Sequence, residues 1–362
     1  MTIFILVYNL TNGGAERVAS LWARGFAEVG HNVFLVIGDD ISPVTYTVPE
    51  SVKIRSIASY KPLSPLRYID RLHKLRKLVV KENPDVILGI LGRALWAKMV
   101  TMDKKIPIIN TEHNSFERPA SAPMSRSVEF DKFQKNKLYD KVTVLTQADK
   151  DFIGNRLKNV VVLPNPLAFE PIEVSKIEVK KKIILAAGRL NVWHTKGFDN
   201  LIKAWGLIQK KYPDWKLRII GSGKERDYDY LNNLAKQNGV ENALELAGFI
   251  DDPVPCYREA SVFVLSSRYE GFGMVLIEAM SQGCACVACD YKGRQSEIIT
   301  NENEGFVCPP DDYIDLAKAL DRVLSDDELR HKIQLGAIKR SEFYSVENTT
   351  KRWEEIFKDL KN

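Results

Sequence analysis

Cysteines are scarce in this sequence, and long apolar runs are missing. There are five cysteines among 362 residues, and Cys284, Cys286 and Cys289 lie in an apolar run without Cys-x-x-Cys spacing. This pattern favours buried small side chains over a disulfide framework or a metal site. No run of about 18 apolar residues occurs, which argues against a transmembrane helix. The first residues, Met1 to Tyr8, lack the basic flank and cleavage site of a signal peptide, so we expect a cytoplasmic protein.

Nucleic-acid recognition motifs are also missing, although the chain carries a net charge of +5. Residues 1–170 contain 24 Lys and Arg against 17 Asp and Glu, whereas the remainder contains 28 against 30. Much of the surplus lies in residues 60–81, where one acid, Asp70, stands among seven basic residues. They are Lys61, Arg67, Arg71, Lys74, Arg76, Lys77 and Lys81. Leucines and other apolar residues accompany these charges, a pattern typical of a segment that binds an anionic membrane surface. A solvated helix is the alternative.

Short apolar runs alternate with longer segments of helical period along the chain. In the first half the runs cover residues 3–8, 33–37, 86–91, 106–111 and 142–146. After a polar stretch at 164–182, they restart at 183–187, 217–220, 262–266 and 285–288. This alternation predicts parallel sheets with helical crossovers, and the length exceeds what one hydrophobic core usually supports. We therefore predict two α/β domains, with a final amphipathic helix over 346–360.

Several loops after these runs carry glycines or charges, and ligands of parallel sheets bind at the carboxyl ends of the strands. Gly13 and Gly14 precede a helical segment, where backbone amides can approach a phosphate, although any tight turn uses such glycines. Arg189 and Lys196 flank the start of another helix and suit a diphosphate, unless they are ordinary solvated charges. Gly221 opens a close-approach loop that lacks the third glycine of a dinucleotide fingerprint, which disfavours NAD.

One loop after a predicted strand holds the most informative pattern. Glu270 is followed by Gly271, Phe272 and Gly273, and helical character begins at Gly273. The free backbone amides of a helix start can bind a ligand. Glu278 lies eight residues after Glu270 among apolar neighbours, so it should be buried and need a polar partner. We predict that Glu270 and Glu278 project toward the same cleft.

The spacing from Glu270 to Glu278 resembles the Glu-x7-Glu motif of retaining glycosyltransferase family 4. The resemblance covers essentially the whole chain, because the Gly-Gly loop and the Arg...Lys pair described above match the family as well. It implies the GT-B fold, an α/β architecture of two facing Rossmann-like domains with a deep interdomain cleft. We expect an acceptor domain at 1–165, with the helix at 346–362 crossing back to it, and a nucleotide-sugar donor domain at 166–345.

The resemblance also implies roles for individual residues. Arg189 and Lys196 would neutralise the donor diphosphate, which itself helps to deprotonate the acceptor, so that no protein nucleophile is needed. Glu270 and the amides of residues 271–273 would hold sugar hydroxyls and phosphates, while Glu278 would accept hydrogen bonds from the ribose. His113 lies where family members often place a histidine that contacts the transferred sugar, although it could be a structural histidine.

Two segments depart from the family pattern or imitate another one. Asp227-Tyr228-Asp229 has the form of an Asp-x-Asp metal motif, but its helix-starting context favours capping or solvated charge. We expect no required metal and no cofactor besides the nucleotide-sugar co-substrate. The loop at 290–297 differs from the commonest Gly-to-Glu spacing of the family, which leaves its contacts open.

The function implied by the resemblance is a metal-independent, retaining transfer of a hexose or N-acetylhexosamine. The donor would be a nucleotide sugar, UDP-linked by family frequency, and the acceptor a lipid-linked or polysaccharide glycan in bacterial cell-surface glycan biosynthesis. Such an enzyme would work at the inner face of the cell membrane as a peripheral protein. The alternatives are a GT-B-fold nucleotide-sugar 2-epimerase and a non-catalytic nucleotide-sugar-binding protein.

Overall fold

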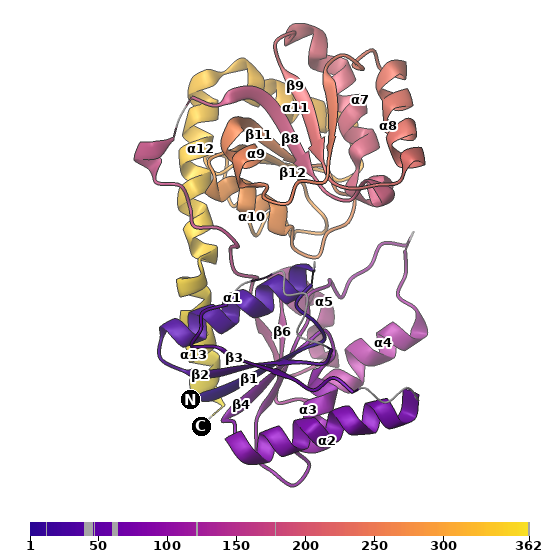
Figure 1. Ribbon diagram of the computed structural model, residues 1–362. Helices are drawn as coiled ribbons and strands as arrows, with labels where there is room; N and C mark the ends of the chain where they lie inside the picture. Colours follow the sequence, from indigo (N-terminus) through magenta and orange to yellow (C-terminus); the bar gives the residue numbers. More distant parts are fainter. Residues whose placement is uncertain are drawn as a thin grey trace. The chain divides into compact units, whose positions relative to one another are not determined.

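The computed structural model describes residues 1–11, 13–39, 46, 48–59, 64–120, 122–177 and 179–360. The chain forms two compact units, which we call the amino-terminal unit and the carboxy-terminal unit. The first consists of residues 1–168 and 345–362, and the second of residues 169–344. The last residues of the chain therefore belong to the amino-terminal unit (Figure 1).

Each unit is built on a parallel sheet. The strands of the amino-terminal unit are β1 Thr2–Val7, β2 Asn32–Ile37, β3 Lys53–Ser56, β4 Val86–Ile90, β5 Ile108–Thr111, β6 Lys141–Val144 and β7 Val160–Val162. Those of the carboxy-terminal unit are β8 Lys181–Ala187, β9 Lys216–Ile220, β10 Leu244–Gly248, β11 Ala260–Leu265, β12 Ala285–Cys289 and β13 Phe306–Cys308. The spatial orders are β3-β2-β1-β4-β5-β6-β7 and β10-β9-β8-β11-β12-β13. Both are doubly wound orders, which reverse direction between β1 and β4 and between β8 and β11.

Helices cover both faces of each sheet, as expected for parallel strands joined by crossovers. The helices of the amino-terminal unit are α1 Gly14–Glu28, α2 Ser64–Glu82, α3 Ala94–Val100, α4 Arg126–Phe133, α5 Gln147–Ile153 and α13 Val346–Asp359. Those of the carboxy-terminal unit are α6 Trp193–Lys196, α7 Phe198–Ile208, α8 Glu225–Gln237, α9 Val254–Glu259, α10 Met274–Ser281, α11 Tyr313–Ser325 and α12 Asp327–Ser341. In the amino-terminal unit, α1 and α13 lie on one side of the sheet and α2 and α3 on the other (Figure 1).

The central strands come from the continuous apolar runs of the sequence because both of their faces are buried. Residues 3–7 of β1 and all of β4 and β12 are buried. The cysteines of β12 and its approach, Cys284, Cys286 and Cys289, are buried free thiols, which confirms their interpretation as small core side chains. Two α/β domains with parallel sheets are likewise confirmed.

Helix α13 completes the core of the amino-terminal unit. Trp353 is fully buried and meets Trp22 of α1 edge to face at 5.1 Å between ring centroids. Phe357 packs on Phe26 at 5.5 Å. Gly25 of α1 allows this approach, because a Cβ there would lie 2.2 Å from Oγ1 of Thr350. The amphipathic pattern of the tail thus reflects packing on α1.

Candidate functional site

The switch point of the carboxy-terminal sheet brings together the loops that follow β8 and β11. Gly197, with a φ of +65°, ends the short helix α6 against the start of the second loop. A Cβ on Gly197 would lie 1.9 Å from the carbonyl oxygen of Ser266, so only glycine permits this approach. Ser266 also donates from Oγ to the carbonyl oxygen of Lys196, at 2.8 Å. The two loops are therefore locked side by side.

Lys196 and Glu270 form an ion pair across these loops. The Lys196 Nζ lies 2.5 Å from Oε1 of Glu270, and the Oγ of Ser267 donates to the same oxygen at 2.9 Å. The two side chains are 21% and 15% exposed, so the pair is shielded but within reach of a ligand. A half-buried ammonium beside a carboxylate can bind an anion and a hydroxyl at neighbouring positions. The sequence predicted both residues, and the structure brings them together.

Arg268 holds this arrangement in place, a role that the sequence pattern did not indicate. Its two terminal nitrogens bind both carboxylate oxygens of Asp199 on α7, at 2.7 and 2.9 Å. Its Nε donates to Asp311 at 2.6 Å, and Nη1 donates to the carbonyl oxygen of His194. A bidentate guanidinium fixes the loop geometry more firmly than a single contact does. The available signal was its position three residues after β11, at the carboxyl edge of the sheet.

The structure places Arg189 and Gly221 on the neighbouring loops of the same edge. Arg189 is exposed directly after Gly188, where β8 has ended. A Cβ on Gly221 would lie 1.9 Å from the carbonyl oxygen of Gly188, and the Gly221 amide donates to Gly248 at 2.7 Å. Close packing of two loops therefore accounts for this glycine whether or not a ligand approaches it.

The stretch from Gly271 to Gly273 precedes α10, as the sequence predicts. Gly273 has a φ of +98° and stands at the amino end of the helix. The ring of Phe272 is buried against Tyr344, at 5.6 Å between centroids, so it can offer a ligand its backbone alone. Gln295, in the segment whose contacts the sequence left open, donates to the carbonyl oxygen of Phe272 at 3.3 Å.

Glu278 is buried on α10, with 4% of its surface exposed. Its Oε2 accepts a hydrogen bond from the hydroxyl of Tyr257 at 3.1 Å, which supplies the polar partner that the sequence required. Tyr257 belongs to α9, before the first residue of β11, whereas Glu270 follows the last residue of that strand. Glu278 is therefore more deeply buried than Glu270, and it is held by a buried tyrosine.

Asp227 caps a helix, which confirms its interpretation as a capping residue. Its Oδ2 accepts from the backbone amide of Lys224 at 2.8 Å, at the start of α8. Within the described ranges, no group of three or more His, Cys, Asp or Glu side chains is placed to hold a metal ion.

His113 lies in the amino-terminal unit, after β5. Its Nδ1 is 3.2 Å from Oδ1 of Asn165, and its Nε2 is 3.0 Å from Oγ1 of Thr111. Burial lowers the pKa of His113 to about 4, and this effect outweighs the hydrogen bond to Asn165 and the charge of Glu112, which raise the pKa. The imidazole is therefore neutral near pH 7 and serves as a hydrogen-bonding group.

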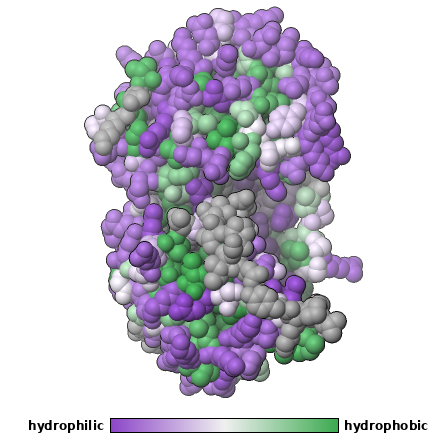
Figure 2. Space-filling view, viewed as in Figure 1, coloured by the Kyte–Doolittle hydropathy of each residue, from purple (hydrophilic) through white to green (hydrophobic). Residues whose placement is uncertain are grey.

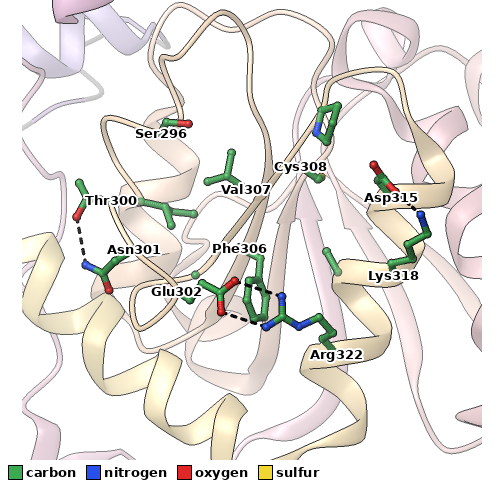
Figure 3. A pocket seen from close by; sticks show the side chains of 14 residues that line it. Ser296, Thr300, Asn301, Glu302, Phe306, Val307, Cys308, Asp315, Lys318 and Arg322 are labelled. Atoms are coloured by element: carbon green, nitrogen blue, oxygen red, sulfur yellow. Dashed lines mark hydrogen bonds and ion pairs between the residues drawn. The ribbon is translucent and has the colours of Figure 1, made fainter.

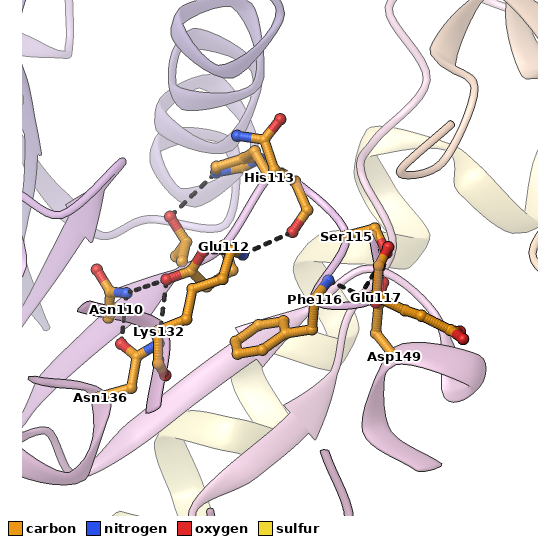
Figure 4. A network of polar contacts seen from close by, with 11 residues as sticks. Asn110, Glu112, His113, Ser115, Phe116, Glu117, Lys132, Asn136 and Asp149 are labelled. Atoms are coloured by element: carbon orange, nitrogen blue, oxygen red, sulfur yellow. Dashed lines mark hydrogen bonds and ion pairs between the residues drawn. The ribbon is translucent and has the colours of Figure 1, made fainter. Parts of the chain in front are cut away.

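A buried polar network holds the loop that carries His113 (Figure 4). Lys132, 5% exposed, donates to Oε2 of Glu112 at 2.9 Å and to the carbonyl oxygen of Asn114 at 3.0 Å. Asn136 donates to the other oxygen of Glu112 at 3.0 Å. Asp149 accepts from the amide of Phe116 at 2.8 Å, which fixes the far end of the loop. This network rigidly positions His113.

The Gly13-Gly14 pair lies at the start of α1, after β1. Gly13 is the N-cap residue, with extended backbone angles, and no side chain caps the helix. The carboxylate of Glu16 folds over Gly13, where a Cβ would lie 1.9 Å from Oε2. Nothing lies within 4 Å of a Cβ built on Gly14, so the second glycine faces open space.

A cavity of about 570 Å³ opens elsewhere in the carboxy-terminal unit (Figure 3). It is lined by residues near β13 and α11, and none of the predicted site residues is among them. Its charged side chains pair with one another, Glu302 with Arg322 and Asp315 with Lys318. Charges that are already paired leave the cavity little to offer an anionic donor.

Helix α2 contains most of the basic segment 60–81, and residues 60–63 lie outside the described ranges. The expectation of one amphipathic interfacial face needs correction: Leu75 and Val79 are fully buried in the core of the unit, and Arg71 is 8% exposed. Leu66 and Ile69, in the first turns, are the exposed apolar residues. No helix of the described chain is both long and apolar enough to cross a membrane.

Known proteins share this fold and sequence pattern. Residues 169–340 match the family Glycosyl transferases group 1, and residues 12–170 match Glycosyltransferase Family 4. An uncharacterized glycosyltransferase of Haemophilus influenzae is 30% identical over 349 residues, which cover 95% of this chain and 96% of that protein. HepE of Anabaena, solved in complex with UDP and glucose, superposes with a TM-score of 0.77 over 99% of this chain and 100% of its own, at 18% identity.

The name of a third relative states its acceptor. The Campylobacter jejuni GalNAc-alpha-(1->4)-GalNAc-alpha-(1->3)-diNAcBac-PP-undecaprenol alpha-1,4-N-acetyl-D-galactosaminyltransferase is 25% identical over 374 residues, which cover 100% of this chain and 99% of that protein. The predicted GT-B architecture, with two parallel-sheet α/β domains, is confirmed by these neighbours. Both family models match, and one relative is 30% identical over nearly the whole length of this chain. The chain therefore belongs to the glycosyltransferases with a family 4 amino-terminal domain and a group 1 carboxy-terminal domain.

Proposed function

We propose that this glycosyltransferase transfers a hexose or N-acetylhexosamine from a UDP-linked sugar, with retention of configuration and without a metal ion. The observation that carries the proposal is the shielded pair of Lys196 and Glu270 at the switch point of the carboxy-terminal sheet. The exposed Arg189 on the same edge adds a second cation. A neighbouring fold solved with UDP supports the choice of carrier.

The proposed chemistry is a same-face substitution. The bond from the anomeric carbon to the diphosphate breaks, a bond to the acceptor oxygen forms on that face, and the acceptor proton passes to the leaving diphosphate. Lys196 would exchange Glu270 for a diphosphate oxygen, and Arg189 would bind the same group. The Glu270 carboxylate and the amides of 271–273 would then receive the sugar hydroxyls and phosphates.

The remaining predicted residues bind rather than react in this proposal. Glu278 would accept hydrogen bonds from the ribose hydroxyls while it keeps Tyr257 as its buried partner. The loops at Gly13-Gly14 and Gly221 would approach the donor through their backbones. His113, held neutral by its surroundings, would contact the transferred sugar as a hydrogen-bonding group.

We further propose that the acceptor is a lipid-linked or polysaccharide glycan, reached at the inner, anionic face of the cell membrane by a peripheral, cytoplasmic protein. Leu66 and Ile69 are 47% and 61% exposed beside basic Arg67 of the same helix. Figure 2 shows hydrophobic side chains among polar ones over the lower part of the view, where Figure 1 places α2. Exposed apolar groups beside cations suit a surface of anionic lipid.

The decisive experiment is a turnover and thermal-shift screen of nucleotide sugars against lipid-linked mono- and disaccharides, with excess chelator. Transfer from one UDP-sugar, with the anomeric configuration kept in the NMR spectrum of the product, is expected. Conversion of the sugar without an acceptor would identify an epimerase, and donor binding without turnover a sensor. A strict requirement for a divalent ion would contradict the metal-free mechanism.

Membrane attachment has its own test. The protein should co-sediment with vesicles at low salt, and this binding should weaken at high salt. The vesicles contain about 30 mol% anionic lipid, which gives a marked surface potential. Leu66→Ser with Ile69→Ser should reduce it several-fold, whereas Val80→Ser, at an exposed apolar position near the other end of α2, should not. Equal binding of both variants would contradict the assignment of the surface.

A further inference from the structure

Two arginines stand at the switch point of the amino-terminal sheet, where the loops after β1 and β4 meet. Tyr8 directly follows β1, and Arg93 follows β4 after a turn in which Leu91 and Gly92 have φ values of +49° and +79°. Arg71 reaches the same place from α2. Its guanidinium carbon lies 5.4 Å from the centroid of the Tyr8 ring, and that of Arg93 lies 5.1 Å from it. The two cations therefore share one aromatic ring.

Neither guanidinium forms an ion pair among the residues that the structure describes, although the Glu16 carboxylate lies close enough to raise the pKa of Arg93. Arg71 is 8% exposed, yet it takes part in no ion pair there, and its buried Nε has no hydrogen-bond partner. The Nε of Arg93 is buried without a partner as well, while its guanidinium packs 4.7 Å from the Trp96 ring. Burial lowers the pKa of Arg93, and the charge of Arg71 lowers it further.

This arrangement costs free energy unless an anion completes it. Burial of an ionised group without a counter-charge costs several kcal/mol, and a cation–π contact returns only about 1–2 kcal/mol of that. Two adjacent guanidinium groups offer a surplus of donors that matches the oxygens of a phosphate or a diphosphate. Arg268, at the edge of the other sheet, is by contrast neutralised by Asp199 and Asp311.

The surroundings indicate where such an anion would come from. Tyr68, on the first turns of α2, contributes to the electrostatic environment of Arg93, and its hydroxyl donates to the sulfur of Met99 on α3. Leu66 and Ile69 on the same turns of α2, and Met102 after α3, leave apolar surface exposed. A phosphate group attached to a hydrocarbon chain would place its anion at the arginines and extend its chain around the start of α2 toward the exposed apolar residues.

We infer that Arg71 and Arg93, stacked on Tyr8, form a binding site for the phosphate or diphosphate group that joins the acceptor glycan to its lipid. This inference rests on the proposed transfer to a lipid-linked acceptor and adds the group by which the acceptor is held. The donor diphosphate is assigned to other residues, Arg189 and Lys196 of the carboxy-terminal unit.

The test is calorimetric titration with inorganic pyrophosphate in the presence of saturating UDP, which occupies the proposed donor site. The wild type should bind one pyrophosphate, and Arg71→Met with Arg93→Met should weaken binding at least tenfold. Arg67→Met is the matched control, because it removes the same charge from an exposed position one turn earlier on α2, and it should change the dissociation constant less than twofold. Equal weakening by the control, or unchanged binding in the double variant, would overturn the site.

Thermal unfolding separates a ligand site from a structural one. Replacement by Met of Arg71 and Arg93, which have no ion-pair partner, should leave the melting temperature unchanged or raise it. Millimolar pyrophosphate should raise the melting temperature of the wild type alone. A melting temperature that falls by more than about 5 °C, together with no stabilisation of the wild type by pyrophosphate, would assign the arginines to folding instead.

Farnesyl diphosphate distinguishes a lipid-borne anion from a free one. It should bind at least tenfold more tightly than inorganic pyrophosphate, and Leu66→Ser with Ile69→Ser should remove that advantage. Equal affinities would refute the lipid part. Failure of the proposed function can be distinguished from failure of this site. The arginine variants should keep UDP binding and donor hydrolysis but lose transfer to the acceptor. Lys196→Ala should lose turnover but keep pyrophosphate binding.

Discussion

Replacement of Lys196 by alanine tests the proposed division of labour at the donor site. In the proposal, the ammonium contacts an oxygen of the diphosphate, which gains negative charge as the sugar departs. The contact with Glu270, at 2.5 Å between Nζ and Oε1, demonstrates that an anionic oxygen can reach this nitrogen closely. A unit charge at about 4 Å contributes ~4 kcal/mol when the effective dielectric constant is about 20.

The net effect on the rate is smaller, because only part of a charge develops at the leaving group. Loss of a single group that stabilises a developing anion usually costs about 3 kcal/mol. We therefore expect Lys196→Ala to lower kcat on the order of 100-fold at saturating donor, since each ~1.4 kcal/mol is a factor of ten. Release of UDP in the presence of acceptor measures this rate.

The control for Lys196→Ala is Lys182→Ala. Lys182 is the second residue of the same strand, β8, and lies near its amino end, where it is 59% exposed and pairs with Asp214. Its replacement should leave kcat within twofold. The melting temperature of Lys196→Ala should fall by only a few degrees, because Glu270 keeps its hydrogen bond from Ser267. A variant with unchanged kcat and a raised KM for the donor would refute the reasoning.

Three further predictions concern Glu278, His113 and Lys132. Glu278→Gln should raise the KM for the donor about tenfold and change kcat less than threefold, since the carboxylate is proposed to bind the ribose in ground and transition states alike. The reverse pattern, with kcat falling and KM constant, would exchange the roles of Glu278 and Lys196. The pKa of His113 is about 4 in the folded protein and 6.5 ordinarily, so between these pH values the folded state binds fewer protons than the unfolded state. The free energy of unfolding therefore decreases as the pH falls from about 6.5 to about 4. Urea unfolding should show a loss of roughly 2 kcal/mol between pH 7.5 and 4.5 in the wild type beyond that in His113→Gln; equal losses would contradict the assigned pKa. Lys132→Met should lower the free energy of unfolding by about 3 kcal/mol, because it leaves the Glu112 carboxylate without its buried cation, and Lys132→Met with Glu112→Gln should recover much of this loss. Lys135→Met, at an exposed pair with Asp131, is the control and should cost under about 1 kcal/mol in the same unfolding assay.

The strands that were not predicted from the sequence share one position in the fold. They are β3, β7, β10 and β13, which lie at the four edges of the two sheets. An edge strand pairs on one side and buries less of its surface, so it needs no long apolar run. Residues 53–56 of β3 show this clearly, since three of the four are exposed. The central strands were predictable because burial on both faces demands continuous apolar residues.

The sequence by itself determined the fold class, the loops at the carboxyl ends of the central strands and the Glu-x7-Glu spacing, because these depend on local patterns. The tertiary structure decided which residues meet: Lys196 and Glu270 are 74 positions apart and join only because Gly197 lets the two loops touch. It also decided that Leu75 belongs to the core and that Arg71 lies beneath the surface next to Tyr8. Periodicity along a helix identifies an apolar face, but what covers that face depends on strand order and on neighbours distant in the sequence.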